Sequence, residues 1–512
     1  MRISRIISII FLSAPVVLSA QSLTVKLGEV IKRSEANAML TPPTPKSVLG
    51  GLVGAGGSTY YKFLYDTKDG KAYLGCAYFG AKYYNVGILD EYVNLKGAEK
   101  LSAEFVDDPK EKIQIEGFVE IEGKKFIVYS VNYASLNESS VYVNQLDDNM
   151  VIMGSPIRLV TFSGSKKETR SIYFETSLHK KTFLISRLVD VDEKKDQGLE
   201  CTAFDMHFNT LWSKTFALNE KTKKATAVDF QIDDAGNVYI LALQHPKPKE
   251  DIPAIHTYLW KEKAYHEEAL NRPEHKSFGA KLFILNGHEP VVAGMYRESR
   301  VDGVFCYRIN TITGIPEEML YAPIGDEINK GLADGLENLG YGVRQMEKLP
   351  SGNYVFSMDD HRIMSGKSTT YHISTSAYVL AFKAEEGIVW ERLVHKKQAG
   401  SLNHSVNGHV MLRSGDHVFV VYNDHPANFD KSLTDKSVGN YTSIAGHVVV
   451  QEIDAEGNIK KYALLEEEEG KNYNLLIRHV NRVSESLYHV ELTHRDFFSI
   501  GDHYRYATLS TE

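Results

Sequence analysis

Short runs of alternating apolar and polar residues recur along this chain, whereas the three- and four-residue spacing of an amphipathic helix is scarce. Clear runs are Phe126–Val131, Tyr239–Leu243, Val355–Met358 and Val418–Tyr422, and each follows a glycine or polar turn. A period of two is typical of half-buried strands, and a tight turn between two such runs predicts a β-hairpin. The pattern therefore predicts an all-β chain built from hairpins.

The predicted hairpins recur at intervals of about 50 to 70 residues, which is the spacing of a repeat architecture. Their turns are Asp69-Gly70, Glu122-Gly123, His179-Lys180, Ala235-Gly236, Asn286-Gly287, Ser351-Gly352, Ser414-Gly415 and Ser484-Glu485. A second hairpin follows most of them, as at Ala203–Trp212, Arg308–Gly314, Ala381–Trp390 and Glu452–Lys460. Four strands in a unit of about 60 residues is the composition of one β-propeller blade.

We therefore predict a single β-propeller domain over residues 21–512, with about eight four-stranded blades. Seven is the alternative, because the unit at residues 245–275 is irregular and rich in lysine. After its first hairpin the last unit offers one further strand, His503–Leu509, while the chain begins with a lone strand, Leu23–Ile31. Pairing this first strand with the last blade would close the ring and cover an open sheet edge.

Two insertions interrupt the strands. Trp260–Leu270 and residues 325–340 are each interpreted as a short helix, with a polar loop as the alternative. Neither is large enough to form a second domain.

The first 20 residues have the pattern of a secretory signal peptide. Arg2 and Arg5 precede an apolar stretch, Ile6–Val17, and the small residues Leu18-Ser19-Ala20 form a cleavage site. The alternative is a membrane anchor, but the apolar stretch is shorter than the ~20 residues that a span needs. We expect a periplasmic or secreted protein with no membrane span after cleavage.

Composition narrows the classes of partner. A net charge of −8 without a basic cluster argues against nucleic acid and against anionic membrane surfaces. Hydrophobic residues make up 43% of the chain, which is enough to build a large core. Cys76, Cys201 and Cys306 are odd in number, far apart and set in apolar text, so we expect buried free thiols rather than a disulfide framework.

Candidate chemistry gathers where the second strand of each unit ends. In a propeller these positions open on one face, and they form our candidate ligand-binding rim. Its members are His245, Arg297, Asp359, Asp360, His361, Asn423, Asp424, His425, Asn428, His494, Arg495 and Asp496. The alternative is that strand ends are polar simply because they enter water.

No metal or other cofactor is predicted at this rim. Equivalent places in different blades lie on a circle, so four imidazoles could not reach one zinc ion at ~2 Å. His361, His425 and His494 are the best candidates if a metal does bind.

Several motifs support a resemblance to known propellers. At Gly387–Trp390, Lys397-Gln398, Tyr422–Asp424 and Asn428 the sequence resembles uncharacterised secreted proteins of Bacteroidota, over roughly residues 200 to 465. That resemblance implies an envelope propeller and no particular activity. A turn followed by tryptophan is also similar to the repeats of quinoprotein-like and outer-membrane-assembly propellers. Only Trp212 and Trp390 show it, so no quinone cofactor is expected.

Enzyme motifs do not support a reaction. There is no G-x-S-x-G elbow, and His266–Leu270 lacks the second histidine of a zincin helix. Gly51–Gly57 lacks the Lys-Ser/Thr end of a phosphate loop, and Asp454–Asn458 is better interpreted as a hairpin turn than as a calcium loop. No catalytic residue is assigned.

Three functions remain open for such a propeller. The first is binding or scaffolding, in which the rim recognises a protein or glycan of the cell envelope. The second is a hydrolase or lyase acting on polysaccharide or peptide through rim Asp and His, and the third is a purely structural component. Convergence of Asp360, Asp424 and His425 in a deep pocket would favour the enzyme, whereas divergence would favour binding.

Overall fold

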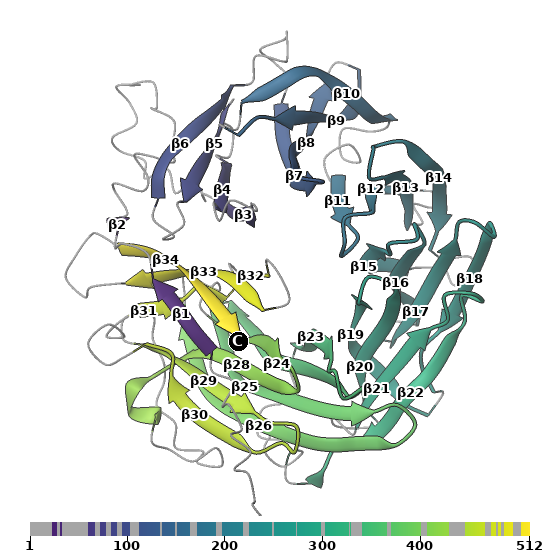
Figure 1. Ribbon diagram of the computed structural model, residues 1–512. Helices are drawn as coiled ribbons and strands as arrows, with labels where there is room; N and C mark the ends of the chain where they lie inside the picture. Colours follow the sequence, from purple (N-terminus) through teal and green to yellow (C-terminus); the bar gives the residue numbers. More distant parts are fainter. Residues whose placement is uncertain are drawn as a thin grey trace, which may run out of the picture.

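The fold is seen in a computed structural model of the chain (Figure 1). It describes residues 23–27, 31–32, 60–66, 72–77, 83–89, 95–102, 112–133, 136–148, 151–163, 172–190, 197–218, 225–247, 250–272, 274–297, 303–326, 328, 340–365, 370–400, 407–429, 446–465, 473–477, 480–482, 486–494 and 503–511. Within these residues, strands form eight antiparallel sheets that follow one another around a ring. The protein is a β-propeller, as the repeat predicted.

The first four blades run from the centre of the ring outward. Blade 1 contains β3 (Tyr60–Asp66), β4 (Ala72–Ala77), β5 (Tyr83–Leu89) and β6 (Leu95–Ser102). Blade 2 contains β7 (Lys112–Ile121), β8 (Lys124–Tyr133), β9 (Glu138–Leu146) and β10 (Ile152–Ser163). Blade 3 contains β11 (Ile172–Thr176), β12 (Thr182–Asp190), β13 (Gln197–Asp205) and β14 (Thr210–Ala217). Blade 4 contains β15 (Ala225–Ile232), β16 (Val238–Lys247), β17 (Glu250–Leu259) and β18 (Ala264–Ala269).

The last four blades complete the ring. Blade 5 contains β19 (Lys276–Leu285), β20 (Glu289–Arg297), β21 (Gly303–Ile309) and β22 (Pro316–Pro323). Blade 6 contains β23 (Gly340–Lys348), β24 (Tyr354–Ser365), β25 (Thr370–Lys383) and β26 (Gly387–Gly400). Blade 7 contains β27 (Val410–Ser414), β28 (His417–Asp424), β29 (His447–Ile453) and β30 (Ile459–Ala463). Blade 8 contains β31 (Tyr473–Leu475), β33 (Leu487–His494), β34 (His503–Thr511) and β1 (Leu23–Leu27), with β2 (Ile31–Lys32) and β32 (Asn481–Arg482) paired at its side.

The connections divide between two faces. Turns between the first and second strands, and between the third and fourth, lie on what we call the turn face. Connections from the second strand to the third, and from one blade to the next, lie on the opposite link face. The predicted rim belongs to the link face.

The predicted turns of the first hairpins fall between paired strands. Asn286 and Gly287 join β19 to β20 with φ angles of 51° and 74°, which is the mirror-image turn that suits the twist of two strands. Asp69-Gly70 and Ser484-Glu485 lie outside the described residues, although the strands on either side of each turn are paired. The second hairpins are also present, as β13–β14, β21–β22, β25–β26 and β29–β30.

The start of the chain closes the last blade. β1 pairs antiparallel with β34, from Leu23 opposite Thr511 to Leu27 opposite Ala507, and forms the outermost strand of blade 8 (Figure 1). This confirms the predicted closure. A strand from the beginning of the chain thus covers an edge that would otherwise expose unpaired backbone groups.

The helix predicted at Trp260–Leu270 is wrong. Residues 260–263 form a turn, and β18 follows it, paired along its length with β17. Tyr265 lies directly opposite Tyr258 and packs against the apolar cluster between blades 3 and 4, and this packing favours strand over helix. The irregular unit is therefore a full blade, which accounts for eight rather than seven. Of the second insertion, residues 327 and 329–339 lie outside the described residues.

The hydrophobic core lies between neighbouring blades. Separate clusters fill successive seams from blade 2 to blade 8, and each combines apolar side chains of the two facing sheets. Cys201 and Cys306 are buried free thiols within these seams, and burial raises the pKa of both. The prediction for these two cysteines is confirmed. In the described part of the chain, no helix is long and apolar enough to cross a membrane.

Candidate functional site

The predicted rim residues come from several second strands that end at the link face. β16 contains His245, β20 ends at Arg297, and β24 contains Asp359, Asp360 and His361. Asn423 and Asp424 end β28, and His494 ends β33. The side chains of His245, Asp360, His361 and His494, and the whole of Arg495 and Asp496, lie outside the described residues. The prediction for these side chains stays a prediction.

Asp359 lies inside the protein rather than on an open rim. Its side chain is only 3% exposed, and its Oδ1 atom lies 3.0 Å from the Lys396 Nζ atom. Ser374 donates its hydroxyl to the same oxygen at 2.5 Å. Burial raises the pKa of Asp359, but the Lys396 ammonium and the hydrogen-bond donors outweigh it and hold the pKa below its usual range. The carboxylate is therefore a buried anion paired with a buried cation.

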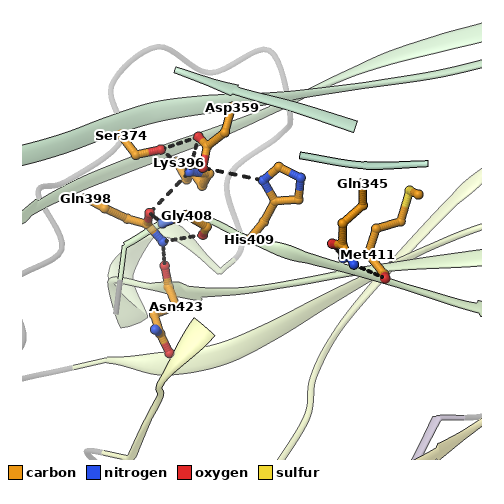
Figure 2. Close-up of polar contacts among 9 residues, drawn as sticks. All are labelled: Gln345, Asp359, Ser374, Lys396, Gln398, Gly408, His409, Met411 and Asn423. Atoms are coloured by element: carbon orange, nitrogen blue, oxygen red, sulfur yellow. Dashed lines mark hydrogen bonds and ion pairs between the residues drawn. The ribbon is translucent and has the colours of Figure 1, made fainter. Parts of the chain in front are cut away.

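Lys396 is the centre of this polar cluster (Figure 2). The side chain is completely buried, and its ammonium donates to Asp359, to the Ser374 hydroxyl and to Gln398 Oε1 at 3.2 Å. Three donors thus meet three acceptors, which is the condition for burying a lysine without a large penalty.

Gln398 ties the link between blades 6 and 7 to both blades. Its Oε1 atom accepts from the Gly408 backbone N–H at 2.7 Å, and its amide donates to the carbonyls of Gly408 at 3.2 Å and Asn423 at 2.8 Å (Figure 2). Gly408 has a φ of 110°, and a Cβ there would meet Asp359 Oδ2 at 3.0 Å. Close approach of the backbone to Asp359 therefore requires glycine.

His409 packs against the carboxylate from the same link. Its Nδ1 atom lies 3.6 Å from Asp359 Oδ2, beyond hydrogen-bond distance, and both ring nitrogens are buried without a hydrogen-bond partner among the described residues. Burial lowers the pKa of His409, Asp359 raises it, and the cations Lys396 and Arg344 lower it. The net direction is downward, so the imidazole is neutral at neutral pH.

Asn423 bonds across a seam between blades, whereas Asp424 bonds within its own link. Asn423 exchanges two hydrogen bonds of 2.8 Å with the backbone of Leu475 in blade 8. Asp424 Oδ1 accepts from the His425 backbone N–H at 2.8 Å and from the Asn428 amide at 2.7 Å. Burial raises the pKa of Asp424, and these hydrogen bonds oppose the shift. Both side chains, which we predicted on an open rim, are at most 1% exposed. Asn423 thus joins blade 7 to blade 8, and Asp424 holds the start of the link that follows β28.

His425 begins the short 3-10 helix η3 (Pro426–Asn428). Its Nδ1 atom accepts from the Ala427 backbone N–H at 3.1 Å, so the imidazole caps the helix instead of facing the Asp424 carboxylate. Pro426 and Ala427 are exposed, as is Arg297, whose guanidinium lies 5.2 Å from the centre of the Phe278 ring. These three residues remain open to solvent on the link face.

The sequence analysis did not predict the residues that contact Asp359. Ser374 and Lys396 lie in strands of blade 6, and His409 lies in the link that follows. The spacing of these residues is a signal that could have been used. Val394, Lys396 and Gln398 are two residues apart on one strand, so their side chains lie on the same face, and all three are buried. Among the described residues, no three His, Cys, Asp or Glu side chains are grouped so that they could hold a metal ion.

The two tryptophans that follow turns each form a hydrogen bond to the next blade. Trp212 donates its indole N–H to Gly236 O at 3.0 Å, and Trp390 donates to Ala455 O at 3.1 Å. Each acceptor lies in a turn of the next blade. Gly457 has a φ of 83°, and a Cβ there would approach Trp390 at 2.7 Å, so this turn also needs glycine. The motif is accounted for by blade packing alone.

Comparison with known proteins assigns this chain to no family. No family model matches the sequence, and no curated protein matches it. Solved structures with a similar course of the chain include the polysaccharide lyase Uly1, at 10% identity and a TM-score of 0.37, covering 78% of this chain and 90% of the lyase. The WD40 domain of SCAP from fission yeast matches at 10% identity and a TM-score of 0.36, covering 89% and 92%.

A third solved structure is the β-propeller domain of the Trilobed protease from Pyrococcus furiosus, at 11% identity and a TM-score of 0.34. The match covers 80% of this chain and 98% of that domain. The resemblance to Bacteroidota envelope proteins and to quinoprotein-like propellers stays a prediction.

Proposed function

We propose that this chain is a recognition or scaffold protein of the periplasm or cell surface, which binds a protein or glycan of the cell envelope through its link face. The observation that carries this proposal is the orientation of Asp424 and His425. Asp424 is buried against Asn428, and His425 turns to the backbone of Ala427. Among the described residues, no hydrogen bond joins the two side chains that would serve as acid and base.

The hydrolase or lyase alternative needs an accessible carboxylate beside a proton carrier. Asp359 is paired with Lys396 out of reach of solvent, and Asp424 is 1% exposed. Neither carboxylate is exposed to a substrate as the chain is folded. The burial of Asp359 and Asp424 therefore supports the recognition proposal over this alternative.

A rigid rim suits recognition without chemistry. The Gln398 and Asn423 hydrogen bonds fix the position of the blade 6 to blade 7 link and of the blade 8 inner strand. Exposed residues of the link face, such as Pro426 and Ala427, are then held in a fixed arrangement, which reduces the entropy that a partner must overcome on binding.

Photo-crosslinking from the two faces tests this proposal. A photoreactive phenylalanine replaces Ala427 on the link face or, as the matched control, Glu385 in an exposed turn on the opposite face. The full chain carrying each probe is irradiated in the native envelope fraction. We expect a discrete adduct from position 427 and none from position 385.

Adducts that form only from position 385, or equally from both positions, would contradict recognition through the link face. The enzyme alternative is tested separately, by assaying release of sugar reducing ends, unsaturated uronates or peptide amines from the same envelope fraction. Turnover by the wild type that disappears in Asp424→Asn would replace the recognition proposal with catalysis.

A further inference from the structure

The seam between blades 3 and 4 holds a lysine ammonium among three aromatic rings. Lys214 Nζ lies 4.5 Å from the centre of the Tyr258 ring, 5.4 Å from Tyr265 and 5.5 Å from Phe216. A cation within about 6 Å of a ring face is attracted by the negative face of the ring. Three faces around one ammonium make an aromatic cage.

The cage is built from two blades. Lys214 and Phe216 alternate on β14, the outer strand of blade 3, and therefore share the face toward blade 4. Tyr258 and Tyr265 lie directly opposite each other on the two outer strands of blade 4. The site is thus on the side wall of the propeller, apart from the link face.

The rings are fixed before any ligand arrives. Tyr265 hydrogen-bonds through its hydroxyl to His256 Nδ1 at 2.7 Å, and the Tyr258 ring packs edge-on against Trp212 at 5.0 Å between ring centres. Phe216 and Tyr258 are buried, whereas Lys214 and Tyr265 are half-buried, so the lysine side chain is partly accessible to solvent. Rings that are already held in place need little further ordering when a ligand binds.

The lysine has no carboxylate to hold it there. Within the described part of the chain, Lys214 forms no ion pair, and its charge is met only by the ring faces. The other described lysines that lie over a ring each contact a single ring, as Lys460 does with Tyr462 at 5.5 Å. The rings around Lys214 therefore favour a cation that needs no hydrogen-bond acceptor.

We propose that this cage is a binding site for a quaternary or methylated ammonium group, and that Lys214 occupies it in the free protein as a built-in competitor. A trimethylammonium group suits three ring faces better than a primary ammonium, because it is more weakly hydrated and needs no hydrogen-bond acceptors. The lysine stem is flexible and leaves toward solvent when such a ligand enters. The site is independent of the proposed recognition by the link face.

Titration by NMR with tetramethylammonium and with choline tests the proposal on the full chain. Lys214→Ala empties the cage, and we expect at least about tenfold tighter binding than to the wild type, with the ligand methyl signals shifted upfield by the rings. The neutral isostere 3,3-dimethylbutan-1-ol should not bind. Lys460→Ala removes a lysine from a single ring and is the matched control, for which we expect no gain.

Three results would overturn the proposal: Lys214→Ala binding no more tightly than the wild type, equal binding of choline and its neutral isostere, or an equal gain in Lys460→Ala. Lys214→Gln retains most of the side-chain length without the charge. It must change affinity in the same direction, so the proposal remains testable if Lys214→Ala does not fold.

Discussion

Removal of the Asp359 carboxylate should destabilise this protein far more than removal of an exposed carboxylate. Asp359→Ala leaves the Lys396 ammonium completely buried, with only Ser374 and Gln398 as partners. Breaking a buried ion pair by removing one partner costs about 3–5 kcal/mol. At about 2.1 cal/mol/K per residue, a chain of 512 residues unfolds with an entropy of about 1 kcal/mol/K. The melting temperature should therefore fall by about 3–5 °C.

Scanning calorimetry of three variants checks this reasoning. Glu386→Ala breaks the exposed pair with Lys383, whose side chains are 64% and 47% exposed, and should lower the melting temperature by no more than about 1 °C. Asp359→Ala/Lys396→Met also removes the stranded charge and should recover part of the loss. Two results would refute this explanation by the buried charge. One is a melting temperature of Asp359→Ala equal to that of Glu386→Ala, and the other is a melting temperature of the double variant below that of Asp359→Ala.

Three further outcomes are expected. Because burial lowers the pKa of His409, the unfolded chain binds a proton at mildly acidic pH that the folded chain excludes. The melting temperature should therefore fall as the pH drops below about 6.5, and calorimetry from pH 8 to 5.5 should show a smaller fall for His409→Gln. Asn423→Ala leaves the N–H and C=O of Leu475 without hydrogen bonds, which costs about 1–3 kcal/mol of stability for each group. The melting temperature should therefore fall by about 2–6 °C, and an unchanged value would show that water replaces the amide. A chain that starts at residue 28 lacks β1 and should expose the edge of β34, so light scattering should show oligomers. A chain that starts at residue 23 keeps β1 and should show the same monomer–oligomer balance as one that starts at residue 21.

The architecture could be predicted because its determinants are local. Alternation of apolar residues marks each strand, and pairs such as Asn286-Gly287 mark turns that need positive φ angles. Closure by the first strand followed from the cost of an open sheet edge. The helix predicted at Trp260–Leu270 shows where such local evidence fails. β18 is an outer strand with half-exposed residues, so its alternation is weak, and its two Glu and two Ala residues suit a helix equally well.

The orientation of the rim side chains could not be predicted from the sequence in the same way. One residue of register moves a side chain to the opposite face of a sheet. β24 has an irregularity between Asp359 and Arg362, and β25 has another between Ser374 and Ser376. Lys396 contacts Asp359, 37 residues earlier in the chain, beside these two irregularities. The predicted strand ends match those of β20, β28 and β33, at Arg297, Asp424 and His494, whereas β24 continues past Asp359 to Ser365. Which of these side chains turn inward depends on tertiary structure.

The inward polar residues solve a problem that is specific to propellers. Neighbouring inner strands belong to different sheets, so no backbone ladder fixes one blade against the next. Side-chain amides supply this connection: Gln231 donates to Leu282 O, Gln345 exchanges hydrogen bonds with the Met411 backbone, and Asn423 does the same with Leu475. Apolar packing alone would allow blades to slide, whereas a buried amide paired with one backbone position specifies a single register, since any other leaves polar groups unsatisfied. Asn423 lies at the link face and is itself buried, so the position of this face, on which the proposed recognition depends, is held by a side chain that is inaccessible to solvent.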